Sequence, residues 1–185
     1  MTVLISLLRG VNIGGHHIMK MDALRDLYED LGLRDAQTYV QSGNVVFQTK
    51  AGDISKLTKR IEDAIEKKFG FRIFVVLRTK AELGEVIARN PCAKRRGIDP
   101  RKLAVMFLKE TPTAECLQSA LKIETAPEEL WISGCHAYVY FTNGMARPKM
   151  SWPAIERALK TTGTGRNWNT VTKLYELAQV LETSA

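Results

Sequence analysis

The sequence predicts an α+β fold built from two halves with the same order of elements. Short apolar runs, typical of strands, alternate with stretches in which apolar residues recur every three or four positions, as in amphipathic helices. The order β-α-β-β-α-β can be followed through residues 1–91 and again from residue 102. Because this is the order of a ferredoxin-like unit, we expect two tandem ferredoxin-like (βαββαβ) subdomains packed together.

The first half contains four expected strands and three expected helices. Apolar spacing indicates the helices, and Gly32 and Gly70 end the first two of them. A turn at residues 42–44 joins the two middle strands as a hairpin. In chain order we expect strands at Val3–Leu8, Gln37–Gln41, Val45–Thr49 and Phe71–Arg78, and helices at Met21–Leu31, Ile54–Phe69 and Ala81–Arg89.

The second half repeats this series, and its hairpin turns at Gly134. The short match between residues 41–44 and 132–135 is weaker support for a repeat than the shared element order. We expect strands at Leu103–Leu108, Glu129–Ser133 and Ala137–Thr142, a short irregular or strand segment at Gly163–Asn167, and helices at Ala114–Leu121, Trp152–Leu159 and Val171–Leu181.

Domain boundaries follow from this repeat. Residues 1–91 form an N-terminal subdomain, the polar and basic residues 92–101 connect the halves, and residues 102–185 form a C-terminal subdomain with a terminal helix. Strands such as Leu4–Leu8 and Ala104–Leu108 are apolar on both faces. A sheet with one face in water would alternate more cleanly, so we expect both faces to be covered, by the other half or by a second subunit.

The composition is that of an ordinary globular protein, with 185 residues, 45% apolar and 25% charged. The net charge of +7 favours anionic partners such as phosphates or RNA, although the sequence shows no continuous basic stripe. The three cysteines, Cys92, Cys116 and Cys135, are far apart, which argues against a disulfide framework and for a reducing compartment. With no recognisable signal peptide and no apolar run near the roughly 20 residues of a membrane helix, we expect a cytoplasmic protein.

A candidate site lies where the first strand enters a glycine-rich loop. In the expected topology the first two strands are parallel with the third between them, so the end of Val3–Leu8 meets the turn after Gln41. This edge would combine a guanidinium, two amides, a hydroxyl and glycine N–H groups, which together suit a phosphate or carboxylate. The residues concerned are Arg9, Asn12, Gly14, Gly15, Ser42 and Asn44.

The same residues also have a purely structural interpretation. The glycines can supply turn geometry, and Asn12 and Asn44 can hydrogen-bond to local backbone. The loop has neither the spacing of a Walker A motif nor that of a G-x-G-x-x-G fingerprint. The residues alone leave both interpretations open.

Histidines and cysteines give no sign of a metal or of a nucleophile. His16 and His17 point to opposite faces if extended, and no carboxylate or cysteine stands at ligand spacing, so no metal site is expected. Cys135 and His136 also point apart on a strand, which argues against a catalytic dyad. We therefore expect no metal and no cofactor.

Two features of the second half are relevant to nucleic-acid binding. Tyr138 and Tyr140 share a strand face with His136, as in a base-stacking platform, but the first half has no matching pair. A role in the core or in a subunit contact is the favoured interpretation. The basic clusters at residues 94–96 and 101–102 are interpreted as a solvated linker rather than an anion site.

The segment before the last expected helix is unusual because it carries an arginine. Asn167 or Asn169 is placed to cap that helix. The positive charge of Arg166 opposes the helix dipole there, so we expect it to pair with an acid or to bind an anion. We add Arg166 and Asn167 to the candidate ligand-binding residues.

Several of these stretches are shared with a known family. They are Leu8–Gly15, Lys20-Met21 with Leu24, Thr38–Phe47, Phe69–Phe71, Asn90-Pro91, and Arg166–Val171 with Lys173-Leu174. In them the chain resembles, nearly end to end, the domain-of-unknown-function 1697 family (DUF1697), a largely bacterial and uncharacterised group. The resemblance implies an α+β fold of two ferredoxin-like subdomains and no established activity, cofactor or catalytic residue. Because the shared motifs gather at the predicted edge and around Arg166, we hypothesise that both line one cleft between the halves.

Three functions remain open from the sequence. The favoured one is a protein that binds a small anionic ligand, such as a nucleotide or phosphorylated metabolite, at the glycine-rich edge. The second is an enzyme acting on a small substrate by positioning and electrostatics, because no activated nucleophile or paired carboxylates are recognisable. The third is an interaction module for protein or RNA, with homo-oligomerisation also open.

Overall fold

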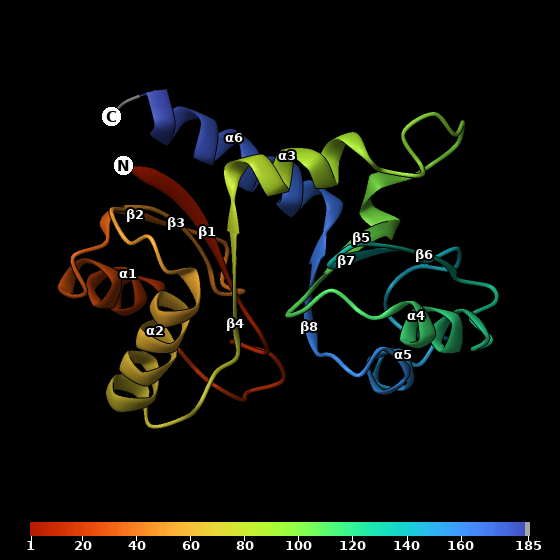
Figure 1. Cartoon of the computed structure of the whole chain (residues 1–185), viewed down its shortest axis with the longest axis horizontal. Helices are drawn as coiled ribbons and strands as arrows, with labels where there is room; N and C mark the ends of the chain where they lie inside the picture. The colour runs from red at the N-terminus through yellow and green to blue at the C-terminus, as the bar shows by residue number, and fades with distance from the viewer. Residues whose placement is uncertain (184–185) are drawn as a thin grey trace. The chain divides into compact units, whose positions relative to one another are not determined.

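The computed structural model describes residues 1–183, which form an α+β fold with two four-stranded antiparallel sheets and six α-helices (Figure 1). The chain divides into two compact units. The first unit contains Met1–Glu85 together with the chain from Thr172 onward, and the second contains Val86–Val171. Each unit holds one sheet, which confirms the predicted α+β class with two sheets.

The first unit follows the order β-α-β-β-α-β. Its elements are β1 (Thr2–Leu8), α1 (Met21–Asp30), β2 (Arg34–Tyr39), β3 (Asn44–Thr49), α2 (Ile54–Phe69) and β4 (Val75–Thr79). The strand order is β2-β3-β1-β4, and all neighbouring strands are antiparallel. Strands β1 and β2 therefore run in the same direction with β3 between them, as predicted, and their carboxyl ends lie at one edge of the sheet.

The second unit has the same order and the same strand arrangement. Its elements are β5 (Leu103–Leu108), α4 (Ala114–Leu121), β6 (Glu129–Ser133), β7 (His136–Tyr140), α5 (Trp152–Leu159) and β8 (Gly163–Asn167). The strand order is β6-β7-β5-β8, again antiparallel throughout. A short 3₁₀ turn at Pro100–Lys102 leads into β5. The expected irregular or strand segment at residues 163–167 is a strand.

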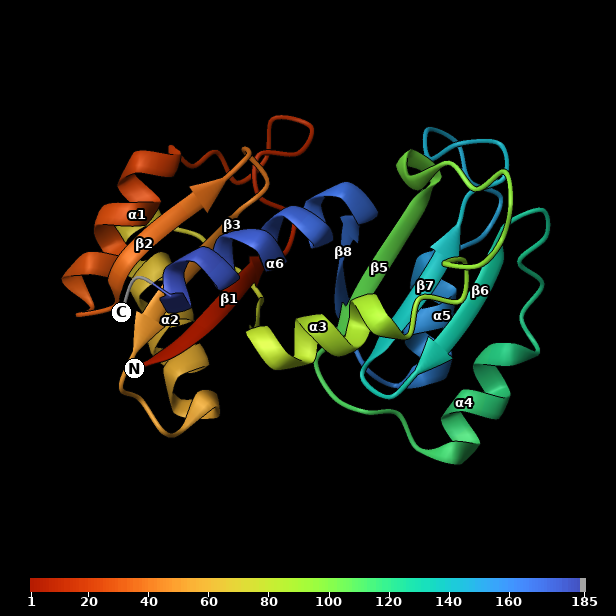
Figure 2. The same ribbon diagram turned by 90° about the horizontal axis from the view of Figure 1, so that it is seen from above.

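Two helices, α3 (Lys80–Ala88) and α6 (Trp168–Thr183), each pass from one unit into the other. Within the first unit, Nε2 of Gln48 in β3 donates to the carbonyl of Leu181 at 3.0 Å, and Figure 2 shows α6 crossing β1 and β3. Within the second unit, the Tyr138 hydroxyl of β7 donates to the carbonyl of Val86 in α3 at 2.7 Å. In the first unit, α6 thus contacts the sheet face opposite α1 and α2. In the second unit, the end of α3 contacts the sheet face opposite α4 and α5.

The core of the first unit lies between its sheet and helices α1 and α2. Tyr28 and Phe47 meet edge to face with ring centroids 5.2 Å apart. The Tyr28 hydroxyl donates to Oγ of Ser6 at 2.6 Å, which satisfies a polar side chain inside this core, and burial raises the pKa of Tyr28. Every residue of β3 is buried, so both faces of this strand are covered, whereas three of the six residues of the edge strand β2 are exposed.

Element boundaries differ from the predictions mainly at strand ends. β4 begins at Val75 rather than Phe71, because residues 71–74 approach the sheet before pairing with β1. β2 begins three residues early, at Arg34, and a register shift between Arg34 and Gln37 accommodates Asp35 at a φ of +53°. None of the helices within residues 1–183 has the length and apolar character needed to cross a bilayer.

Candidate functional site

The sheet register assembles the predicted edge from four strand ends. Leu7 pairs with Asn44 and Asn44 pairs with Tyr39, so the ends of β1 and β2 flank the start of β3. The backbone N–H of Arg9 donates to the carbonyl of Phe74 at 2.9 Å, which brings in the approach to β4. We call residues 9–20, 39–44 and 70–75 the glycine-rich edge.

Asn12 organises the loop of this edge. Its side-chain Nδ2 donates to the carbonyls of Met19 (2.9 Å) and Gln41 (2.8 Å), and its Oδ1 accepts from the Met19 N–H at 2.8 Å. Asn12 also adopts a φ of +55°, a conformation that asparagine tolerates better than most residues. Its amide therefore closes the loop on itself and ties it to the turn between β2 and β3.

The tip of the loop is a tight hairpin. The His16 N–H donates to the Ile13 carbonyl at 3.0 Å, and Gly14 and Gly15 between them have φ values of +58° and +79°. Two successive positive φ values are typical of a type I′ turn, which glycines adopt without strain. Both glycines are exposed, so a ligand can approach their backbone closely.

At the base of the loop, Gly43 packs closely against Leu8. Gly43 has a φ of +69°, and a Cβ added there would lie 2.8 Å from Cβ of Leu8. The fully buried Asn44 donates from Nδ2 to the carbonyl of Tyr39 and to Oγ of Ser42, both at 2.9 Å. Asn44 is therefore engaged inside the protein, and Ser42 is half-buried at the surface.

The charged side chains of the glycine-rich edge are all positive. Its three segments carry Arg9, Lys20 and Arg72, together with two histidines, and they contain no aspartate or glutamate. Two carboxylates of α2 contact it: Glu62 accepts from the Val75 N–H at 2.9 Å, and Glu66 lies 3.9 Å from Arg72. Among the described residues, the loop from 9 to 20 has cations and no acidic residue of its own.

The two candidate residues of the second unit have clear local roles. Arg166 in β8 is 7% exposed and donates from Nη1 to Oγ1 of Thr164 and to the carbonyl of Gly165, both at 2.8 Å. Burial lowers the pKa of its guanidinium to about 10. Oδ1 of Asn167 accepts from the Asn169 N–H at 3.0 Å, so Asn167 caps α6 as predicted. Since Arg9 belongs to the first unit and Arg166 to the second, their common cleft stays a prediction.

The first unit also contains a buried arginine that was not among the predicted site residues. Arg78 is 8% exposed, donates from Nη1 to the carbonyl of Leu77 at 2.8 Å, and pairs with Ile5 of β1. Arg166 pairs in the same way with Val105 of β5, and each arginine stands two residues before a helix. The repeated position of an arginine before each final helix was a signal that could have identified it.

The histidines, cysteines and tyrosines singled out in the sequence are spread over several elements and loops in the described part of the chain. Among residues 1–183, no group of three or more His, Cys, Asp or Glu side chains is arranged to hold a metal ion. The three cysteines are free, and burial raises the pKa of the Cys92 thiol despite the opposing effect of Arg95. Tyr138 is buried, as the core interpretation predicts, and burial raises its pKa to about 12.

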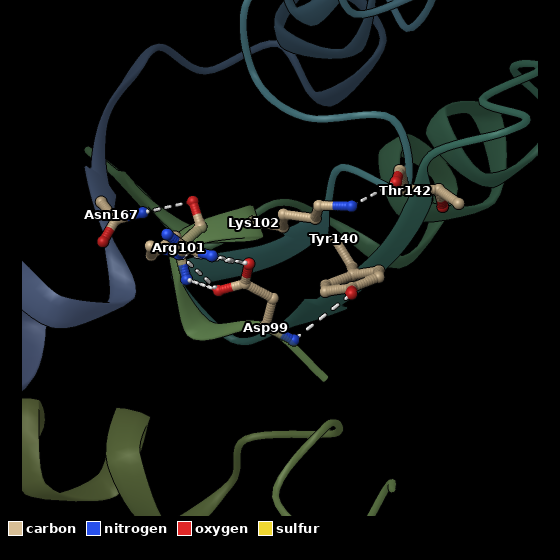
Figure 3. A network of polar contacts seen from close by, with 6 residues as sticks. All are labelled: Asp99, Arg101, Lys102, Tyr140, Thr142 and Asn167. Atoms are coloured by element: carbon tan, nitrogen blue, oxygen red, sulfur yellow. Dashed lines mark hydrogen bonds and ion pairs between the residues drawn. The ribbon is translucent and has the colours of Figure 1, made fainter. Parts of the chain in front are cut away.

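The basic connection between the halves is anchored to the second sheet (Figure 3). Asp99 binds Arg101 with both carboxylate oxygens, at 3.1 Å to Nε and 3.0 Å to Nη2. Nζ of Lys102 donates to the Thr142 carbonyl at 2.9 Å, and Nδ2 of Asn167 donates to the Arg101 carbonyl at 2.9 Å. The connection is therefore held at its end, while the Arg101 side chain stays 81% exposed.

Comparison with known proteins identifies relatives. A family model described as "Protein of unknown function (DUF1697)" matches residues 1–138. No curated protein matches the chain. Among solved structures, the conserved bacterial protein SP0830 from Streptococcus pneumoniae has a TM-score of 0.71 and 19% sequence identity, covering 96% of this chain and 98% of that chain. At this identity the likeness shows the fold alone.

Proposed function

The chain belongs to the DUF1697 family, and we propose that it binds a small anion, a phosphorylated metabolite or a nucleotide, at the glycine-rich edge. The observation that carries this proposal is the charge of the edge: its three segments together contain Arg9, Lys20 and Arg72 and no acidic residue. Cationic side chains beside exposed glycine backbone are a common way to bind phosphate groups.

The loop of residues 9–20 is ordered by its own hydrogen bonds without a ligand. The three hydrogen bonds of Asn12 hold residues 12–19 in one conformation, so little loop entropy is lost on binding. In this proposal Arg9 supplies the charge, the Gly14-Gly15 backbone allows close approach, and Ser42 offers a hydroxyl. Asn12 and Asn44 position these groups through their own hydrogen bonds, and participation of Arg166 and Asn167 is a prediction.

The strand orders support the finer assignment that each unit is a ferredoxin-like (βαββαβ) subdomain. In both sheets the strand that comes after the first helix lies at one edge, and the last strand lies at the other. The free cysteines, two of them buried, support the expectation of a reducing, cytoplasmic setting.

A thermal-shift experiment tests the proposed function. The purified chain is heated with inorganic phosphate, sugar phosphates and nucleotides, and a ligand present at about 100 times its Kd should stabilise it by about 2.7 kcal/mol. Arg9→Ala should abolish the shift, whereas Arg34→Ala, which removes an exposed arginine from β2, should retain it. A ligand that stabilises both variants equally would place the site elsewhere, and no shift with any of them would contradict the proposal.

A further inference from the structure

Positive charge is concentrated in the second unit. Of the 27 lysines and arginines and 20 aspartates and glutamates, residues 86–171 contain 13 and 7, which leaves 14 and 13 for the rest of the chain. The second unit therefore has a net charge of +6 and the first a net charge of +1.

Nearly half of these cations lie in one short stretch, residues 89–102, which we call the basic segment. It contains Asp99 as its single acidic residue. Its cations are Arg89, Lys94, Arg95, Arg96, Arg101 and Lys102. All are exposed except Lys102, which is half-buried.

The basic segment lies on an aromatic sheet face. Trp131 of β6 pairs with Tyr138 of β7, and Glu129 pairs with Tyr140, so these four side chains share one face. The intervening residues of β6, Leu130 and Ile132, instead pack into the core on the opposite face. Tyr138 is closed off by Val86, whereas Trp131 stays half-buried at the edge strand.

Arg95 connects the basic segment to this face. Its guanidinium carbon lies 5.7 Å from the centre of the Trp131 ring and 6.0 Å from that of Tyr140. Both terminal nitrogens donate to Glu129, at 2.9 and 3.0 Å, which holds the planar group against the rings. Because Glu129 offsets the charge of Arg95, the exposed Lys94 and Arg96 beside it are the cations best placed to meet an anion.

We propose that the basic segment and Trp131 form a binding surface for single-stranded nucleic acid. An unstacked base stacks on the Trp131 ring or on the guanidinium plane of Arg95, and phosphates contact Lys94 and Arg96. Aromatic rings and arginine planes at the edge of a sheet, with cations alongside, can serve as a platform for single-stranded RNA and DNA. A duplex keeps its bases stacked and cannot use the ring.

Binding is measured with the full chain and a fluorescein-labelled single strand of about 15 nucleotides, as RNA and as DNA, between about 50 and 200 mM salt. Lys94→Ala/Arg96→Ala should weaken binding about tenfold and reduce the slope of log affinity against log salt by about 1.4. The matched control, Lys59→Ala/Lys67→Ala, removes the same charge from exposed positions of α2 and should change affinity by less than about twofold.

Stacking is tested separately from charge. Trp131→Leu should weaken binding about fivefold or more without changing the salt slope. Arg95→Lys, which keeps the charge but loses the planar group, should act in the same direction and serves if the Trp131 variant is unstable. Single-stranded RNA and DNA should both bind better than a duplex, and the tighter of the two identifies the natural strand.

Several results would overturn the proposal. Absence of binding by the full chain at about 50 mM salt is one, and equal losses in the two double variants is another. Binding of a duplex or heparin as tightly as a single strand, with Trp131→Leu and Arg95→Lys unaffected, would show a general polyanion surface that does not read bases.

Discussion

The two units share a strand order but differ in the connection between their first strand and first helix. After β1 the chain makes the long glycine-rich loop of residues 9–20, whereas after β5 residues 109–113 lead almost directly into α4. The first unit is nearly neutral and the second carries most of the net charge. The repeated architecture thus supports two different surfaces, a compact cationic edge in one unit and a basic segment over an aromatic face in the other.

A buried arginine near the end of the last strand is common to both units. Arg78 and Arg166 occupy equivalent positions and are almost equally buried. Each bonds to the backbone carbonyl of the preceding residue. Because burying a charge is costly without partners, their equivalence indicates a structural requirement common to both sheets.

The largest difference in stability between equivalent substitutions in the two units is expected at the glycines of their hairpin turns. Gly43→Ala should cost about 3 kcal/mol, because the new Cβ meets Leu8 and must also adopt a positive φ. Gly134→Ala meets no atom within 4 Å and should cost only the strain of its φ, about 1 kcal/mol. Urea unfolding of both variants checks this, and equal losses would contradict the packing role assigned to Gly43.

The stability losses caused by replacing Asn12, in the loop that precedes α1, and Asn167, at the start of α6, should differ less. Asn12→Ala removes three hydrogen bonds and the residue suited to its φ, and should cost about 2 kcal/mol. Asn167→Ala removes a helix cap and should cost about 1 kcal/mol. Asn12→Gly, which tolerates the positive φ, separates the two contributions. If Asn12→Gly matches the wild type in thermal unfolding, the side-chain bonds do not hold the loop.

The smallest expected effect concerns the tyrosines of β7. Tyr138→Phe loses the hydrogen bond to Val86 and should cost about 1 kcal/mol at neutral pH, more than Tyr140→Phe.

Tyr138 also allows a test by pH. Burial raises the pKa of Tyr138 to about 12, above the value of about 10 in an unfolded chain, so the folded state holds this proton more tightly. Its contribution to stability is complete below about pH 10 and is lost as the pH rises through about 12. Alkaline unfolding of Tyr138→Phe should lack this loss, and an unchanged profile would contradict the assignment.

Much of the fold could be predicted where local signals are strong. The bounds of α2 match because Asp53 caps its start, accepting from the Lys56 N–H, and Gly70 ends it at a φ of +78°. Strand β8 was harder because it contains two glycines. A Cβ at Gly163 would lie 2.8 Å from the Phe107 carbonyl oxygen and one at Gly165 would lie 2.7 Å from the Met106 sulfur. Glycine is needed there for close approach, although in sequence it indicates a loop.

The sequence could not predict on which sheet α3 and α6 pack. A periodic apolar stripe shows that a helix covers something, but it does not say which sheet. The contact of Gln48 with Leu181, 133 positions apart, has no local signature. For the same reason the sequence could place Asn12 and Asn44 at the edge but could not show that their amides bond within it.

Backbone amide NMR of the full chain, titrated with inorganic phosphate at constant ionic strength, tests the central claim most directly. If the two units carry different surfaces, saturable shifts within the first unit should be confined to the glycine-rich edge, residues 9–20, 39–44 and 70–75, and should disappear in Arg9→Ala. Saturable shifts confined to the basic segment, or only the weak unsaturable drift of a screened surface, would contradict an anion site at the glycine-rich edge.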